Sequence, residues 1–121
     1  MTSEYLDVPT RDCGAGAVIF RQGDTSEREA YLIHSGTVEI HRSSGSEETR
    51  LMLGPGDLLG EVALFRAGPH SATAVAVEPV TLLVIPEARL ESMVRASPSL
   101  ALALIRQLAR MAAGREDGAA P

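Results

Sequence analysis

The sequence predicts a mainly β domain with α-helix at its C-terminal end: a β-roll (a double-stranded, jelly-roll-like barrel) followed by two helices. Short apolar runs alternate with glycine-containing turns over about residues 5–85, which is typical of closely spaced strands. Beyond Pro86 the apolar residues recur at helical spacing instead. Because 121 residues supply one core and not two, we expect a single domain over residues 1–121, with helices at about 87–95 and 98–113.

Two apolar runs, residues 30–34 and 37–41, flank the dipeptide Ser35-Gly36. This arrangement predicts a hairpin with a tight turn. In the second run apolar and polar residues alternate, which predicts one buried and one solvent-facing side.

The stretch Arg42–Glu48 is polar and rich in Gly and Ser, so we expect a mobile loop at a hairpin tip there. Thr49–Leu53 then returns as a strand. Two further β-branched runs, Ala72–Val77 and Thr81–Ile85, bring the total to about eight short strands.

The two helices have separate start signals. Leu90, Met93 and Val94 lie at i, i+3 and i+4, which predicts the apolar face of the first helix. Ser97 and Pro98 suit the cap and the first position of the second helix, which we expect to end near Gly114.

The second helix is too apolar to be buried on one side only. Its apolar stripe is wide: Leu100, Leu104, Leu108, Met111 and Ala112, broadened by Leu102, Ala103 and Ile105. One side suits the barrel. The other requires either a missing downstream segment or a second copy of the chain. We favour the second copy, a homodimer formed through Ser97–Ala113.

Composition excludes several functional classes. The net charge of −5 and the lack of a Lys/Arg cluster argue against a nucleic-acid partner. Cys13 is the sole cysteine, so no intrachain disulfide is possible. No signal peptide and no run of about 18 apolar residues is present, so we expect a cytoplasmic protein with no membrane partner.

Catalytic signatures are missing as well. The three histidines, His34, His41 and His70, form no His-x-His pair, so no metal site is expected. The sequence has no Gly-x-Ser-x-Gly motif, no Walker loop and no Gly-x-Gly-x-x-Gly loop opening a helix. We therefore expect no enzyme, no catalytic residue and no cofactor.

Residues 60–73 carry the strongest functional signal. Gly60 stands beside Glu61, and the segment closes on Pro69, His70 and Ser71. A glycine lets backbone N–H groups approach an anion, and a carboxylate accepts hydrogen bonds from sugar hydroxyls. The pattern therefore suits a small anionic ligand that carries a sugar. The alternative is a short helical turn that packs on the barrel, with Glu61 merely solvated.

The wider pattern decides between these interpretations, because residues 14–112 resemble the cyclic nucleotide-binding domain family. This family includes catabolite-activator regulators, kinase regulatory subunits and cyclic nucleotide-gated channels. The resemblance rests on turns that match in order: Gly23-Asp24, Gly36, Gly54-Pro55-Gly56-Asp57 and the segment 60–73. The family's phosphate-binding cassette reads approximately Phe-Gly-Glu-x-Ala-Leu, a short spacer, then Pro-Arg-x-Ala-Thr.

The resemblance assigns roles within the cassette. Gly60 and Ala63 match positions whose backbone lies near ribose and phosphate, and Glu61 matches the acid that accepts a hydrogen bond from the ribose 2′-hydroxyl. Leu59 replaces the usual Phe as an apolar wall. His70 stands where the family has its phosphate-binding Arg. The resemblance thus implies ligand contacts from Leu59, Gly60, Glu61, Val62, Ala63, His70 and Ser71.

His70 is the serious departure from the family pattern. A guanidinium is always charged and grips two phosphate oxygens, whereas an imidazole is mostly neutral at cytoplasmic pH. A charge-assisted hydrogen bond contributes about 1.5–3 kcal/mol, so its loss costs about tenfold to a hundredfold in affinity. Ser71 occupies a position that in the family accompanies guanine recognition but also occurs in cAMP binders, so cAMP and cGMP both stay open.

Two functional hypotheses follow. The favoured one is a regulatory module that senses cAMP or cGMP and repositions its C-terminal helices. The alternative is a degenerate interaction or dimerisation module that keeps the fold but no longer binds nucleotide, because His70 replaces the arginine. The downstream effector, and whether the chain is a piece of a larger protein, stay open.

Overall fold

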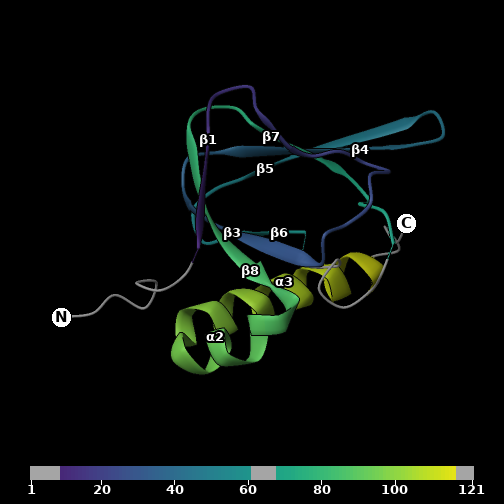
Figure 1. Ribbon diagram of the computed structural model, residues 1–121. Helices are drawn as coiled ribbons and strands as arrows, with labels where there is room; N and C mark the ends of the chain where they lie inside the picture. The colour runs from purple at the N-terminus through teal and green to yellow at the C-terminus, as the bar shows by residue number, and fades with distance from the viewer. Residues whose placement is uncertain (1–8, 61–67, 117–121) are drawn as a thin grey trace.

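The computed structural model describes residues 9–60 and 68–116, with side chains in the last helix described through Arg106 and at Ala109. The described strands form two antiparallel sheets that face each other (Figure 1). The first sheet contains, in spatial order, β1 (Thr10–Cys13), β8 (Val80–Pro86), β3 (Glu29–Ser35) and β6 (Leu58–Leu59). The second contains β2 (Val18–Phe20), β7 (Thr73–Ala76), β4 (Val38–Ser44) and β5 (Glu47–Leu53).

The C-terminal part is helical and covers the first sheet from outside (Figure 1). It consists of the 3-10 turn η1 (Glu87–Arg89), α2 (Leu90–Ala96) and α3 (Pro98–Glu116). Helix α2 packs on β8 and α3 on β6. The predicted β-roll followed by two helices is therefore confirmed.

The first sheet separates two apolar clusters, which explains why β8 is almost continuously apolar. Leu82 points between the sheets, whereas Leu83 and Ile85 point toward the helices. A strand that is covered on both faces needs apolar residues at successive positions. Besides Leu83 and Ile85, the helix-side cluster contains Ala30, Leu32, Leu58, Met93, Leu100 and Ala103.

The predicted hairpin at Ser35-Gly36 is wrong. Strand β3 belongs to the first sheet and β4 to the second, so the chain changes sheets at Gly36. Gly36 has a φ of 94°, and a Cβ there would lie 2.4 Å from the carbonyl oxygen of Pro79. The return crossing from β7 to β8 runs beside it, with the Thr37 hydroxyl donating to Glu78 at 2.6 Å. Two strands with alternating apolar residues can be joined by a hairpin or by a crossing between sheets, so the sequence pattern did not distinguish these two connections.

The hairpin tip predicted within Arg42–Glu48 is confirmed, but the predicted loop is too long. Strand β4 continues through Ser44, and β5 begins at Glu47 after a turn at Gly45, whose φ is 64°. Gln22 fixes the end of β4, because its side-chain amide donates to the Ser43 carbonyl oxygen at 2.8 Å and accepts the Ser43 N–H at 2.9 Å. Polar residues form strand here because the hairpin projects into solvent, where no apolar face is needed.

The start of α3 is capped as predicted. The Ser97 side chain is buried, and its Oγ accepts the Leu100 N–H at 3.2 Å. Further along the helix, Leu100 and Ala103 are buried whereas Leu102 and Ile105 are 45% and 61% exposed. Within the described residues, no helix is long and apolar enough to cross a membrane.

Candidate functional site

The site begins where β6 ends, at Leu59 and Gly60. Leu59 is 1% exposed, belongs to the cluster between the sheets and pairs with Tyr31. Gly60 has a φ of 71°, which favours glycine. A Cβ on Gly60 would lie 3.5 Å from both the Phe20 ring and the Glu29 carbonyl oxygen, so the backbone passes close over Phe20.

Three of the predicted contacts, Glu61, Val62 and Ala63, lie outside the described residues. Their assigned roles rest on the sequence resemblance alone. Ser71 is described and exposed.

The chain returns to the site at residues 68–70, which the loop between β2 and β3 holds. The His70 N–H donates to the Asp24 carbonyl oxygen and the Gly23 N–H donates to the His70 carbonyl oxygen, both at 2.9 Å. A β-bridge joins Thr25 to Pro69. The backbone of His70 is therefore fixed from both sides by loop 21–28.

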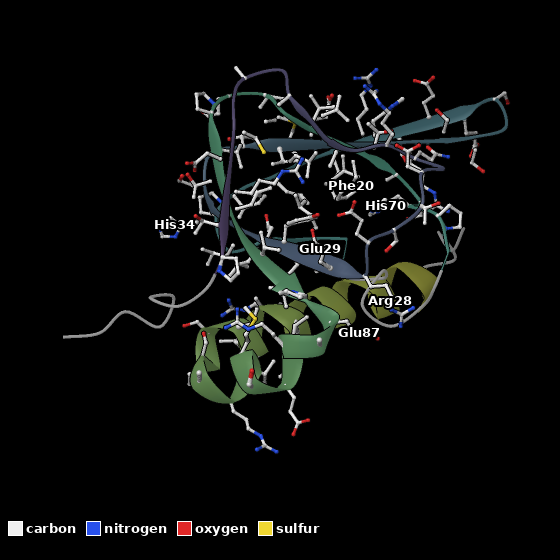
Figure 2. The ribbon with its side chains drawn as sticks, in the orientation of Figure 1. Phe20, Arg28, Glu29, His34, His70 and Glu87 are labelled. Carbon is white, nitrogen blue, oxygen red and sulfur yellow. The ribbon has the colours of Figure 1, made fainter. Side chains whose placement is uncertain are left out.

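The imidazole of His70 stacks on the ring of Phe20, with centroids 4.1 Å apart and planes 6° apart. Phe20 in turn lies 6.2 Å from the ring of Tyr31. Figure 2 shows the labelled side chains of Phe20, His70 and Glu29 in the space between the two sheets. Gly60 and His70, the first and last parts of the predicted cassette that the structure describes, thus meet at Phe20.

Burial lowers the pKa of His70 below its ordinary value, and the nearby carboxylates of Asp24 and Glu27 oppose that shift. The imidazole is therefore neutral at pH 7 and offers one N–H donor. No permanent positive charge stands at position 70.

A cavity of about 200 Å³ lies beside these rings. The described residues that line it are Arg11, Ile19, Phe20, Asp24, Thr25, Glu27, Glu29, Tyr31 and His70. Among them, three carboxylates face one guanidinium. Binding of an anionic ligand in this cavity would therefore have to rely on that guanidinium and on backbone N–H groups.

Arg11 is the cation of the described lining, and the sequence analysis did not identify it. It shares a strand face with the buried Cys13, two residues on, because side chains alternate along β1. Its guanidinium carbon lies 5.8 Å from the centre of the Tyr31 ring, and its Nη2 lies 3.4 Å from the Ile19 carbonyl oxygen. The inward alternation of residues 10–13 was the available signal.

Glu29 and Tyr31 form a hydrogen-bonded pair at the cavity. The Tyr31 hydroxyl donates to Glu29 Oε1 at 2.7 Å. Burial raises the pKa of Tyr31, and the bond to Glu29 raises it further, so the hydroxyl keeps its proton at neutral pH. Tyr31 thereby satisfies part of the hydrogen-bonding capacity of the Glu29 carboxylate.

The described residues contain no group of three His, Cys, Asp or Glu side chains that could hold a metal ion. His41 lies on β4 and contacts Glu48 on β5, with Nε2 3.1 Å from Oε1. The described site offers hydrogen-bonding groups, stacked rings and charged side chains.

Comparison with known proteins matches this chain to a described family and to curated relatives. The sequence model of the family described as "Cyclic nucleotide-binding domain" matches residues 10–97. The "Cyclic AMP receptor protein" of Thermus thermophilus is 41% identical over 97 residues, which are 78% of this chain and 44% of that protein. A "CRP-like cAMP-activated global transcriptional regulator" of Mycobacterium tuberculosis is 32% identical over 101 residues, which are 82% of this chain and 45% of that protein.

A solved structure agrees with these sequence matches. The Thermus thermophilus Catabolite Activator Protein matches with a TM-score of 0.75 and 37% identity, covering 90% of this chain and 52% of that one. The chain spans less than half the length of the two sequence relatives.

Proposed function

The chain belongs to the cyclic nucleotide-binding domain family, and on that premise we propose that it is a regulatory module that binds cAMP or cGMP in the β-roll and repositions its C-terminal helices. The observation that supports this most is the meeting of Gly60 and His70 at Phe20, beside a cavity. The two ends of the cassette thus converge on one binding surface.

The proposed contacts divide by the part of the ligand they serve. Glu61 accepts a hydrogen bond from the ribose, as the family resemblance implies, and the backbone around Gly60 and Ala63 approaches the phosphate. Neutral His70 donates one hydrogen bond, and Arg11 supplies the positive charge that His70 does not. Because Asp24, Glu27 and Glu29 line the same cavity, we expect weaker binding than an arginine at position 70 would give.

The choice between cAMP and cGMP has support on both sides. Both sequence relatives are named for cyclic AMP. Ser71 occupies the position that accompanies guanine recognition in the family. Both nucleotides therefore belong in the test.

A second function is favoured by the surface of α3. Leu102 and Ile105 are exposed on this helix, which suits a homodimer formed through Ser97–Ala113. In the alternative proposal the chain is a degenerate module that uses this surface alone and binds no nucleotide. For either function we propose a cytoplasmic location, which fits the free thiol of Cys13, and no contact with nucleic acid.

Calorimetric titration with cAMP and with cGMP at pH 6 and pH 8 tests the proposal. We expect saturable binding that is tighter at pH 6, because a phosphate favours protonated His70. His70→Gln should remove the pH difference, whereas His41→Gln, which changes a histidine on the β4–β5 hairpin, should keep it. Absence of binding at millimolar concentrations of both nucleotides would reject the sensor in favour of the degenerate module.

A further inference from the structure

The loop 21–28 connects the candidate site to the helices. At one end it holds residues 68–70 by the backbone hydrogen bonds of Gly23 and Asp24 to His70 and by the bridge from Thr25 to Pro69. At the other end it finishes at Arg28, directly before β3. Loop 21–28 therefore connects the backbone of His70 to Arg28.

Arg28 ties this loop to the first helical residue after β8. Its Nε donates to Glu87 Oε1 at 2.7 Å and its Nη2 to Glu87 Oε2 at 2.6 Å. The Glu87 N–H also donates to the Arg28 carbonyl oxygen at 3.0 Å. Figure 2 shows the two labelled side chains next to each other where the roll meets the helices.

The backbone of Arg28 is strained. Among the described residues it is the one non-glycine residue with a positive φ, 57°. A left-handed backbone is unfavourable for a residue with a side chain, because its Cβ approaches the following carbonyl oxygen. The Ser26 hydroxyl supports it by accepting the Arg28 N–H at 2.9 Å. Glycine or asparagine would fit this position with less strain, which points to a role for the guanidinium.

Stability alone does not explain that use. The side chains of Arg28 and Glu87 are 45% and 43% exposed, and exposed ion pairs contribute little to folding free energy. The helices are already held on the first sheet by the apolar cluster that contains Met93 and Leu100. The bidentate contact between Arg28 and Glu87 orients η1 relative to loop 21–28.

We propose that Arg28 and Glu87 are positioning residues that transmit displacement of segment 68–70 to the C-terminal helices. A ligand that engages His70 competes with its stacking on Phe20 and shifts loop 21–28. The paired hydrogen bonds from Arg28 to Glu87 then move η1 and α2 with the loop. The identity of the ligand rests on the proposed function. The route from His70 to Glu87 rests only on the contacts described above.

The test is hydrogen–deuterium exchange on the full chain, with and without cAMP. Arg28→Asn keeps a residue that tolerates the left-handed backbone and removes the guanidinium, and Glu87→Gln removes the charge of its partner. Glu91→Gln is the matched control, because it breaks the exposed pair between Glu91 and Arg95 within α2. The double variant Arg28→Glu with Glu87→Arg restores the pair in reverse.

In the ligand-free chain, Arg28→Asn and Glu87→Gln should each raise amide exchange in residues 21–28 and 68–70 at least threefold. Glu91→Gln should leave exchange there unchanged. With saturating cAMP, wild type should change its exchange in residues 87–106, and Arg28→Asn should lose most of that change while its Kd stays within about threefold. The reversed pair should recover the response at least in part.

The outcomes separate this inference from the proposed function. A full helix response in Arg28→Asn, or bound wild type without any helix response, would overturn the inference and leave nucleotide binding intact. If wild type binds no cyclic nucleotide, the proposed function fails. The ligand-free comparison then decides alone, and unchanged exchange at residues 21–28 and 68–70 in both variants overturns the coupling.

Discussion

The imidazole of His70 lies flat on the ring of Phe20, 4.1 Å away, at the cassette position where the family carries its phosphate-binding arginine. The side chain thus fills part of the space between the sheets and is neutral there. This contact links the departure in sequence to a physical consequence. A stacked imidazole with a lowered pKa therefore stands at position 70, where it carries no permanent charge.

Restoring that charge should strengthen binding. We expect His70→Arg to bind cAMP or cGMP about tenfold to a hundredfold more tightly, because a guanidinium adds charge-assisted hydrogen bonds to the phosphate. Calorimetry at pH 7.5 measures the effect. His41→Arg adds the same charge on the β4–β5 hairpin and serves as the control. Equal affinities of His70→Arg and wild type would show that position 70 does not contact the phosphate.

Burial of His70 should make stability depend on pH. Since its pKa lies below the ordinary value of 6.5, the unfolded chain takes up this proton at a higher pH than the folded chain. The contribution of neutral His70 is fully present above pH 6.5 and is lost as pH falls through the folded pKa. Urea denaturation at pH 7.5 and 5.5 should therefore show a decrease in unfolding free energy that is smaller in His70→Gln. A His34→Gln control should keep the decrease, and an equal decrease in His70→Gln would contradict the assignment.

Arg11 should matter for the phosphate and not for the base. We expect Arg11→Gln to weaken cAMP binding about tenfold and to leave the weak binding of adenosine, which lacks phosphate, unchanged. The cAMP affinity of Arg11→Lys should lie between those of wild type and Arg11→Gln, since lysine keeps the charge but lacks the planar guanidinium that binds two oxygens at once. Arg50→Gln removes an arginine whose side chain is 60% exposed and serves as the control. If Arg11→Gln weakened both ligands equally, Arg11 would act through packing.

The sheet crossing at Gly36 should be more sensitive to substitution than the turn at Gly45. Both glycines have a positive φ, but a Cβ at Gly36 would meet the Pro79 carbonyl oxygen at 2.4 Å, whereas Gly45 has no neighbour within 4 Å. Gly45→Ala should lower the unfolding free energy by about 1 kcal/mol, the cost of the backbone conformation. Gly36→Ala should cost several kcal/mol more, because the backbone must move. Similar thermal unfolding of the two variants would show that the crossing relaxes easily.

The exposed apolar residues of α3 should control self-association. If a second copy covers this helix, Leu102→Glu with Ile105→Glu should convert a dimer to a monomer in sedimentation equilibrium. Leu51→Glu, at a position 59% exposed on β5, is the matched control and should leave the mass unchanged. If the double variant remained a dimer, the interface would have to lie outside this helix surface.

Much of the fold could be predicted because its signals are local. The Ser97 cap needs only a hydroxyl before a proline, and its hydrogen bond to Leu100 is present. Sheet membership is different, because it depends on residues far apart in sequence. The crossing at Gly36 packs against the backbone of Pro79, a contact that no local pattern around Ser35 could indicate. The strand ends on either side of Gly45, residues 42–44 and 47–48, escaped prediction because polar residues pair well wherever a hairpin projects into solvent.

The candidate site shows the same division. The matching turns identified His70 as a departure from the family, and its position on Phe20, a ring that Gly60 also approaches, follows from the fold. Its neutral, stacked state depends on Phe20 and on the loop carbonyl of Asp24, which lie about 50 residues away in sequence. Glu29 was missed because a charged residue does not reveal which face of its strand it occupies, whereas the alternation of Arg11 with the apolar Cys13 was a local signal.

The central claim is that this chain binds a cyclic nucleotide between its sheets, and amide chemical-shift mapping during titration tests it most directly. Addition of cAMP or cGMP should shift the resonances of Gly23, Gly60 and His70 saturably, while those of the β4–β5 turn at Gly45 stay in place. Absence of shifts at millimolar nucleotide, or shifts confined to that turn, would contradict the claim.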